Sequence, residues 1–270
     1  MVEITKKYKI GTRRFGLVNW YGTWTLYVKE VLRFLNVWAQ TLFSPLISSL
    51  LFLLVLSLAI GTERGEVLGV SFITFLAPGL IAMQIIQQAF SHSSSSLMIK
   101  KIDGTIVDLL FAPLSASEAT IAISLAAVTR SVLLAIISII TFTIIIDIQI
   151  QNYLTLISFT FLSSFILGNI GIIAGLWAEK FDNMATVTNF IIVPLSFLSG
   201  TFYSIERLPG FLQTVSEFNP FFYMIDGFRY SFIGTADGSI TFGITYLIIL
   251  SFVSWLVAYI LYKKGYKIKS

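Results

Sequence analysis

Residues 194–230, PLSFLSGTFYSIERLPGFLQTVSEFNPFFYMIDGFRY, decide how the rest of the chain is interpreted. The stretch contains two apolar helical patterns of about 9–12 residues each, separated by Asn219-Pro220. Each helix would be roughly 13–18 Å long, whereas the hydrocarbon core of a bilayer is about 30 Å thick. Neither helix can cross a membrane alone, yet both are too apolar for a solvated loop. The stretch therefore predicts a re-entrant or interfacial helical hairpin, with a surface loop packed on the protein as the alternative.

The composition is that of a membrane protein. Of the 270 residues, 56% are hydrophobic and 12% are charged, and the mean hydropathy is +0.86. Soluble domains average about 25% charged residues. Repeated long charge-free runs predict an all-α polytopic membrane protein with six transmembrane helices and no separate soluble domain. We expect the six spans at residues 40–60, 67–99, 119–146, 153–177, 183–202 and 240–262.

A few residues within these spans predict departures from a plain apolar helix. Pro78-Gly79 predicts a kink, because proline removes a backbone hydrogen bond and clashes with the preceding turn. Arg130 either reaches the cytosolic headgroups, which we favour, or faces the protein interior, since a charge at mid-depth is costly. His92, at the serine-rich end of span 2, is expected to be an interfacial polar residue. Span 4 carries small residues that permit close helix contact, within this chain or with a second copy: Gly168, Gly171 and Gly175.

The first 39 residues predict a cytosolic tail followed by an amphipathic interfacial helix. Residues 1–15 are basic, which suits a segment close to anionic lipid. Bulky apolar residues then recur at helical spacing, while Lys29, Arg33 and Asn36 fall on the opposite face. A helix packed on other parts of the protein is the alternative. The apolar face comprises Trp20, Trp24, Tyr27, Val31, Leu35 and Trp38.

Residues 97–118 form the longest polar interruption before the opening stretch. An apolar stripe runs along them, and Asp108 lies off this stripe. The pattern predicts a short surface helix ended by Ala112-Pro113. This helix is either a connector that skims the lipid surface or a protrusion that docks on a soluble partner. The stripe consists of Ile102, Ile106, Leu109, Leu110 and Pro113.

Lysine and arginine are distributed unequally across the predicted topology. With the N-terminus inside, the tails and residues 97–118 and 179–182 hold 14 of the 18 basic residues. The opposite side holds Arg64, Arg207 and Arg229. This asymmetry is a positive-inside signal. We therefore expect both termini and residues 97–118 in the cytosol and the opening stretch on the extracytoplasmic side.

The sequence lacks the common motifs for nucleotide binding and hydrolytic catalysis. It has no Walker A, dinucleotide-binding, HExxH or GxSxG pattern, no cysteine and a single histidine. Every carboxylate lies at or beyond a predicted span end, whereas proton-coupled carriers usually place protonatable groups inside the membrane. In the opening stretch, the spacing of Asp226 and Arg229 permits an ordinary ion pair. The residues argue against ATP hydrolysis by this chain and weaken the case for an ion-coupled carrier.

Several short motifs occur in order along roughly residues 20–262. They are KEVLRF at 29–34, WAQTL at 38–42, APGL at 77–80, IVDLLFAP at 106–113, LSGTFYS at 198–204 and NPFFYMIDGFRY at 219–230. In these motifs and in the spacing of its spans, the chain resembles the membrane subunits of ABC-2-type exporters. That class includes drug, polysaccharide and haem-related export permeases.

The resemblance implies a single ABC-2 transmembrane domain over residues 1–270. Such permeases pair as dimers and bind two separate ATPase subunits, so ATP and Mg²⁺ would bind the partner and this chain would hold no cofactor. The helix within residues 1–39 would be the connecting helix, residues 97–118 the coupling loop, and residues 203–239 the extracytoplasmic hairpin that caps the exit. The implied coupling residues are Ile102, Ile106, Asp108, Leu109, Leu110 and Pro113. The implied hairpin and exit residues are Phe202, Tyr203, Glu206, Asn219, Pro220, Asp226 and Arg229.

The leading hypothesis is a permease subunit of an ATP-driven exporter in the bacterial cytoplasmic membrane, paired as a homodimer. Abundant Phe and Ile, with no buried charge pair along the path, favour a hydrophobic or lipid-like substrate; the resemblance adds glycans and drugs. The expected partners are an ABC ATPase, a second copy and the lipid bilayer, with no nucleic acid. The alternatives are a membrane enzyme or assembly factor with an extracytoplasmic site, and an ion-coupled carrier.

Overall fold

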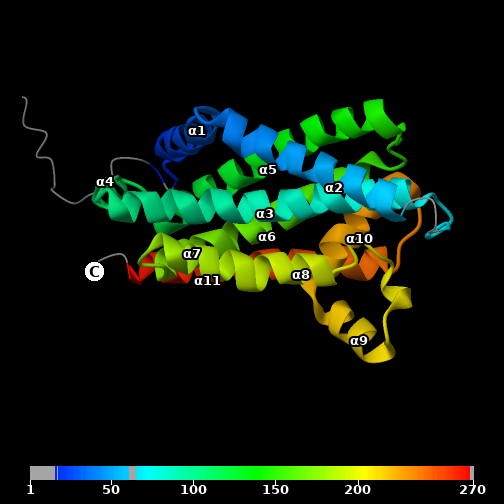
Figure 1. Cartoon of the computed structure of the whole chain (residues 1–270). Helices are drawn as coiled ribbons and strands as arrows, with labels where there is room; N and C mark the ends of the chain where they lie inside the picture. Colours follow the sequence, from blue (N-terminus) through cyan, green and yellow to red (C-terminus); the bar gives the residue numbers. More distant parts are fainter. Residues whose placement is uncertain (1–15, 17, 61–64, 268–270) are drawn as a thin grey trace, which may run out of the picture.

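The computed structural model describes residues 16, 18–60 and 65–267 of the chain (Figure 1). Within these ranges its regular structure is helical and contains no β-strand. Six helical segments there are long and apolar enough to cross a membrane, which confirms the predicted number of spans. The predicted basic tail, residues 1–15, lies outside the described residues, as do residues 61–64.

The spans lie close to the predicted positions. Span 1 is a π-helical segment (Ala39–Phe43) continued by α2 (Ser44–Ile60). Span 2 is α3 (Phe72–Ile102), and span 3 is α5 (Ala116–Ile146). Span 4 is α6 (Tyr153–Trp177), and span 6 is α11 (Ile240–Lys263). Span 5 combines α7 (Phe181–Val187), a π-helical segment (Thr188–Ile192) and α8 (Val193–Leu198). It therefore ends at Leu198 and not at residue 202, because the chain turns at Gly200, whose φ is +76°.

Helix α3 differs from the prediction at its C-terminal end. It continues to Ile102, beyond the predicted end of the span at residue 99, so residues 100–102 of the predicted 97–118 interruption are part of the helix. The serine-rich run lies inside the helix, where hydroxyls bond to carbonyls of the preceding turn, as Ser95 Oγ does to the His92 oxygen (3.1 Å). The helix also continues through Pro78. The kink at Pro78-Gly79 stays a prediction.

Helices α3 and α6 form the centre of the bundle, and glycines bring their backbones together. A Cβ added at Gly171 would lie 2.6 Å from the Phe90 carbonyl oxygen, and one at Gly175 would lie 2.9 Å from that of Ser94. A Cβ at Gly168 would approach Ala127 of α5 (3.2 Å). The small-residue face of span 4 therefore packs within this chain, against α3 and α5.

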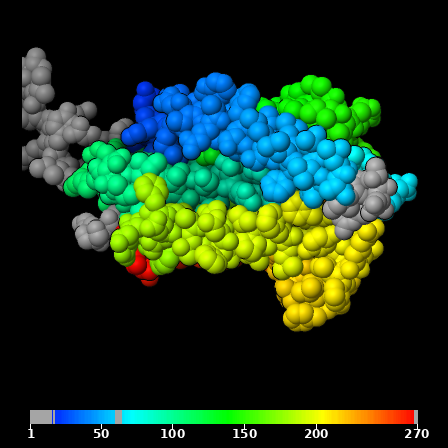
Figure 2. Space-filling view, viewed as in Figure 1, coloured from blue at the N-terminus to red at the C-terminus, as the bar shows by residue number. Residues whose placement is uncertain are grey.

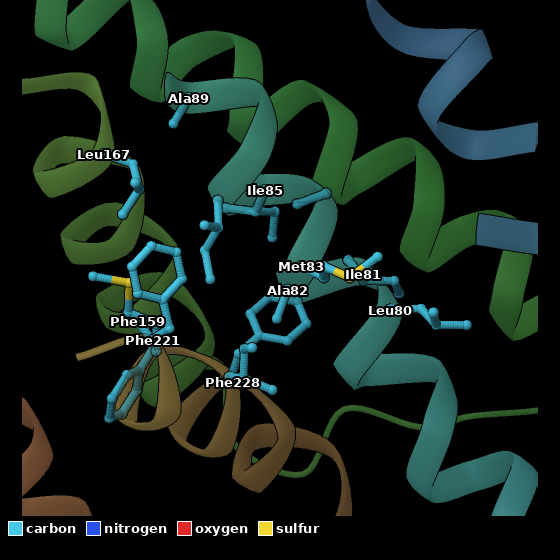
Figure 3. Close-up of a cluster of buried hydrophobic side chains, with 14 of the residues drawn as sticks. Leu80, Ile81, Ala82, Met83, Ile85, Ala89, Phe159, Leu167, Phe221 and Phe228 are labelled. Carbon is cyan, nitrogen blue, oxygen red and sulfur yellow. The ribbon is translucent and has the colours of Figure 1, made fainter. Parts of the chain in front are cut away.

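The apolar core is most continuous where α3, α6 and α10 (Pro220–Ile233) meet (Figure 3). Leu80, Ile85, Phe159 and Phe228 are each at most 1% exposed. Gly227 of α10 makes room for the Phe159 ring, since a Cβ there would lie 2.1 Å from a ring carbon. Packing of this density fixes α10 against the membrane-spanning helices.

The opening stretch forms α9 (Gly210–Phe218) and α10, which break at Asn219-Pro220 as predicted. Pro220 occupies the first position of α10, where a helix needs no N–H donor, and Asn219 Oδ1 accepts a hydrogen bond from Phe221 N (3.1 Å). The two helices differ in burial. Helix α10 lies inside the bundle, whereas α9 projects from one end (Figures 1 and 2). A re-entrant or interfacial placement of the pair stays a prediction.

Helix α1 (Trp20–Leu35) packs beside α5 along one edge of the bundle. The Asn19 N–H donates to Glu118 Oε1 of α5 (2.8 Å), which fastens the start of α1. Trp20 and Trp24 are 76% and 64% exposed, as the predicted apolar face requires. The face with Leu26, Glu30 and Phe34 packs on the protein, whereas Lys29 and Asn36, opposite the predicted apolar face, are exposed. An interfacial position for α1 stays a prediction.

A short helix, α4 (Ile106–Phe111), connects α3 and α5 at the same end of the bundle as the end of α11 (Figure 1). Ser115 Oγ accepts from Glu118 N (3.3 Å), and Ser115 N donates to Glu118 Oε2 (2.7 Å). This capping box starts α5 and limits the connection to residues 103–115.

Candidate functional site

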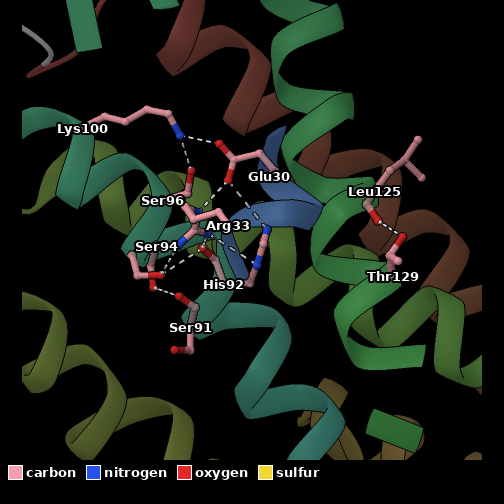
Figure 4. A network of polar contacts seen from close by, with 10 residues as sticks. Glu30, Arg33, Ser91, His92, Ser94, Ser96, Lys100, Leu125 and Thr129 are labelled. Carbon is pink, nitrogen blue, oxygen red and sulfur yellow. Dashed lines mark hydrogen bonds and ion pairs between the residues drawn. The ribbon is translucent and has the colours of Figure 1, made fainter. Parts of the chain in front are cut away.

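A cluster of charged side chains is buried between α1 and α3 (Figure 4). Glu30 of α1 is 1% exposed, and its carboxylate accepts hydrogen bonds from Lys100 Nζ of α3 and from Arg33 Nε (3.0 Å). Lys100 also donates to Ser96 Oγ (2.6 Å). Charge-assisted hydrogen bonds therefore join α1 to α3.

The positive neighbours of Glu30 keep it ionised. Burial opposes ionisation of the carboxyl, but the charges of Lys100 and Arg33 outweigh burial and hold the pKa of Glu30 at about 2. Loss of Glu30 would leave both Arg33 and Lys100 without their counter-charge, whereas loss of either cation would leave Glu30 paired with the other. The two cations therefore depend on Glu30.

His92 of α3 belongs to this cluster. Its side chain is fully buried, its Nε2 lies 3.9 Å from Glu30 Oε2, and its ring meets that of Phe34 edge-on. Arg33 Nη2 donates to the His92 carbonyl oxygen (2.9 Å). His92 is buried in the protein because α3 continues past this position and α1 covers it. An interfacial depth for His92 stays a prediction. Arg33, expected on the polar face of α1, reaches the same place.

A cavity of about 610 Å³ opens beside the cluster, between α2, α3 and α8. Figure 2 shows α3 exposed along the hollow between α2 and the α7–α8 segment. Arg33 and Arg130 contribute to the lining. The remaining polar lining is mostly glutamine and serine from membrane-spanning segments: Gln40, Ser44, Gln84, Gln87, Gln88 and Ser91.

The far end of the cavity is apolar. Phe52, Met83 and Phe197 line it, and the Phe202 ring lies 6.4 and 5.3 Å, centroid to centroid, from the rings of Phe52 and Phe197. Along α3 the lining begins at Met83, continues through glutamines and serines, and ends at Ile99, so its polar part lies between these two apolar residues. The cavity thus has a polar end near the charged cluster and an apolar end near the hairpin.

Arg130 of α5 is buried at the polar end of the cavity. It is 6% exposed, and its Nη2 donates to Gln88 Oε1 of α3. Its Nε has no hydrogen-bond partner. Of the two positions considered for Arg130, the structure shows the interior one, and the favoured placement at the headgroups is wrong.

The two charged residues of α10 do not pair directly. Asp226 accepts hydrogen bonds from Asp237 N (3.0 Å) and Gly238 N (2.9 Å), whereas Arg229 Nη2 donates to the Gly200 carbonyl oxygen (2.6 Å). Burial raises the pKa of Asp226 to about 6 and lowers that of Arg229 from its usual value. Each side chain instead anchors a loop to α10. Asp226 holds the loop that precedes α11, and Arg229 holds the loop that follows α8.

Gly79 of α3 lies next to the Arg229 side chain and to the loop that follows α8. A Cβ at Gly79 would lie 2.6 Å from the Thr201 carbonyl oxygen and 2.8 Å from Arg229 Nη2. The Arg229 guanidinium also lies over the Phe75 ring, 3.9 Å from its centroid. Gly79 is therefore needed for close packing of the loop that follows α8.

The other predicted hairpin residues divide into structural and exposed positions. Asn219 Nδ2 donates to Ser199 Oγ (2.7 Å), and Tyr203 Oη donates to the Leu198 carbonyl oxygen (3.1 Å). These bonds hold the turn after span 5. Glu206 is exposed on the outer part of the hairpin.

The predicted coupling residues do not share one face. Ile106 and Leu109 are 5% and 8% exposed and pack with residues of α1 and α3, whereas Leu110 and Phe111 are 39% and 85% exposed. Ile102 ends α3 and is separate from α4. Asp108 and Pro113 are exposed. The outward apolar face of α4 thus consists of Val107, Leu110 and Phe111.

The glutamine row is the feature that the sequence interpretation missed. Gln84, Gln87, Gln88 and Ser91 recur at the spacing of one helix face inside an otherwise apolar span. That spacing was a usable signal for a polar lining. In the described ranges, no three His, Asp or Glu side chains are arranged to hold a metal ion.

Comparisons with known proteins identify related chains. A family profile described as ABC-2 type transporter matches residues 21–233. The inner membrane transport permease YadH of Escherichia coli K12 is 31% identical over 253 residues, which cover 93% of this chain and 98% of YadH. Nodulation protein J of Neorhizobium galegae is 22% identical over 88% of this chain and 92% of its own length.

Proposed function

Because this chain belongs to the ABC-2 type transporter family, we propose that it is the permease subunit of an ATP-driven exporter. The family in general works with an ABC ATPase, and the six apolar helices belong to a multi-pass inner membrane protein. The observation that carries the proposal is the cavity between α2, α3 and α8, because its polar lining lies inside membrane-spanning segments. Such lining is expensive in a membrane and marks a path for a solute.

The proposed orientation places α4 and both termini in the cytosol. The excess of Lys and Arg at these segments supports it. The hairpin of α9 and α10 then lies on the extracytoplasmic side, at the apolar end of the cavity. Phe202, which packs on two residues lining that end, would close the exit before ATP binding.

Helix α4 would connect the ATPase to the cavity. Its exposed Val107, Leu110 and Phe111 offer an apolar ridge for a cleft on the partner. The opposite face, with Ile106 and Leu109, packs on α1 and α3. Movement of α4 would therefore reach α1 and α3, and through them the charged cluster and the cavity wall.

A second copy of this chain would complete the path. Gln40, Ser44 and Ser48 are exposed, although they belong to span 1. Ser48 Oγ donates to the Ser44 carbonyl oxygen (2.9 Å), but the Gln40 amide would be costly to expose to lipid, whereas a facing copy would enclose a polar channel. This supports a homodimer with the α2–α3–α8 face at its centre.

The cavity favours an amphipathic substrate over a purely hydrophobic one. Its polar end offers amide, hydroxyl and guanidinium groups, and its apolar end offers phenylalanine rings. A glycolipid, a polar lipid or an amphipathic drug would match both ends. The sequence favours a hydrophobic or lipid-like substrate through its abundant Phe and Ile, and the Glu30–Lys100 pair lies beside the cavity and not in its lining.

The test is ATP-dependent accumulation in inside-out membrane vesicles. The tagged full chain is purified from its host, the ABC ATPase that accompanies it is identified, and both are expressed with an active or a hydrolysis-deficient ATPase. We expect molecules that accumulate in the vesicle lumen only with the active ATPase. Absence of an accompanying ATPase, or accumulation that follows an ion gradient without ATP, would refute the proposal.

A further inference from the structure

Arg130 is a buried cation with no acidic group near it in the described part of the chain. Arg229, which is also buried, has Asp226 and Asp237 nearby and donates to the Gly200 carbonyl oxygen. Arg33 and Lys100 both pair with Glu30. Within the described ranges, no carboxylate oxygen lies within 4.0 Å of an Arg130 nitrogen. Its one hydrogen bond goes to the neutral amide of Gln88, and its Nε is unsatisfied. A buried guanidinium in this state is costly unless something else supplies negative charge.

The location of Arg130 indicates where that negative charge would come from. Arg130 lines the cavity itself, together with Gln88, so an incoming molecule can reach it. An arginine presents a planar fork of N–H donors that matches carboxylate and phosphate oxygens. Gln84 and Gln87 line the same cavity from the face of α3 that carries Gln88. Their amides can bond to neutral polar groups around the anion.

The residues that line the rest of the cavity indicate the chemistry of the other end of the ligand. Phe52 and Phe197 lie at the opposite end, where α3 contributes Met83. A molecule that fills the cavity would therefore carry its charge near α1 and α5 and its apolar part toward the hairpin. Arg33 adds a second guanidinium at the charged end, although Glu30 already neutralises it.

We propose that Arg130 is the binding residue for an anionic group, a phosphate or a carboxylate, on an amphipathic molecule carried by this permease. The inference rests on the proposed function in one respect: it takes the cavity as the transport path. The anion could belong to a membrane lipid headgroup or to a soluble amphiphile. Both sources share the chemistry that Arg130 recognises.

Binding is tested on the full chain in neutral detergent by native mass spectrometry. The probes are phosphatidylglycerol, phosphatidylcholine and dodecyl phosphate. We expect phosphatidylglycerol or dodecyl phosphate to bind more tightly than phosphatidylcholine, and Arg130→Gln to weaken that binding about tenfold or more. Arg130→Lys keeps the charge and should retain most of it. Preference for phosphatidylglycerol indicates a lipid headgroup, and preference for dodecyl phosphate indicates a soluble amphiphile.

Two controls separate binding from other effects of charge. Lys264→Gln removes an exposed positive charge outside the cavity and should leave binding unchanged. Arg130→Gln should leave the melting temperature of the ligand-free protein unchanged or higher, because a buried charge is removed; a structural arginine would lower it. Equal binding of phosphatidylcholine, or undiminished binding by Arg130→Gln, would overturn the inference. ATP-driven accumulation is measured separately, so failure here leaves the proposed function standing.

Discussion

Glu30 and Lys100, 70 residues apart in sequence, form a buried ion pair that joins α1 to α3. The carboxylate of Glu30 is 1% exposed and also accepts a hydrogen bond from Arg33. Arg33 and Lys100 therefore share a single carboxylate as their counter-charge. Leu26 of α1 belongs to the same apolar cluster as Ile106 and Leu109 of α4, so the ion pair is close both to the proposed docking helix and to the cavity.

Glu30→Gln should destabilise the protein by about 3–5 kcal/mol, because it leaves the buried Lys100 and the partly buried Arg33 without a counter-charge. The measurement is thermal or denaturant unfolding of the purified protein in detergent. Glu30→Gln combined with Lys100→Met should be more stable than Glu30→Gln alone, since the orphaned ammonium is gone. Glu179→Gln is the matched control: it removes an exposed carboxylate paired with Lys267 and should have no measurable effect. A wild-type melting temperature for Glu30→Gln would contradict the assigned role.

Stability should depend on pH through Asp226 with the opposite sign from Glu30. The pKa of Asp226 is raised from 3.8 to about 6 by burial, so between about pH 4 and pH 6 the folded protein holds a proton that the unfolded chain releases. The free energy of unfolding therefore falls as the pH rises through this window. Glu30, with its pKa lowered from 4.5 to about 2, contributes stability that is lost only as the pH falls below about 4.5.

Asp226→Asn isolates the contribution of Asp226. The difference in unfolding free energy between wild type and this variant should change between pH 4.5 and 6 and become constant above about pH 6.5. Unfolding measured in steps across this range at constant ionic strength gives the profile. A difference that does not vary with pH would show that Asp226 stays ionised in the fold, as its two backbone hydrogen bonds alone would favour.

Periodicity and charge-free runs were enough to predict the helical architecture. They located the spans and the break at Asn219-Pro220, because bilayer thickness and proline geometry act locally on the sequence. The buried cluster could not be predicted in this way. It depends on which face of α1 meets α3, and the pairing of Glu30 with Lys100 is a tertiary contact. The position of Arg130 was ambiguous for the same reason. The sequence of a span shows which residues are polar, but not which helices pack against them.

Gly171→Ala should destabilise the bundle by about 1–3 kcal/mol through overpacking. The added Cβ would lie 2.6 Å from the Phe90 carbonyl oxygen, so α3 and α6 must separate. Gly210→Ala is the matched control, because nothing lies within 4 Å of its Cβ position, and its effect should stay within about 0.5 kcal/mol. Unfolding of the two variants side by side provides the comparison. Equal stability of both would mean that α3 and α6 do not approach as closely as described.

Phe111→Asp should prevent association with the ATPase while leaving the permease folded. Phe111 is 85% exposed on α4, so the substitution removes apolar surface from the proposed contact without disturbing the core. Leu109→Asp buries a carboxylate at a position that is 8% exposed and should lower the melting temperature as well. Co-purification of the ATPase, gel filtration and thermal unfolding are measured together. Phe218→Asp is the control: it is 79% exposed on α9, at the other end of the molecule, and should leave association intact. Retention of the ATPase by a folded Phe111→Asp variant would exclude the outward face of α4 as the docking surface.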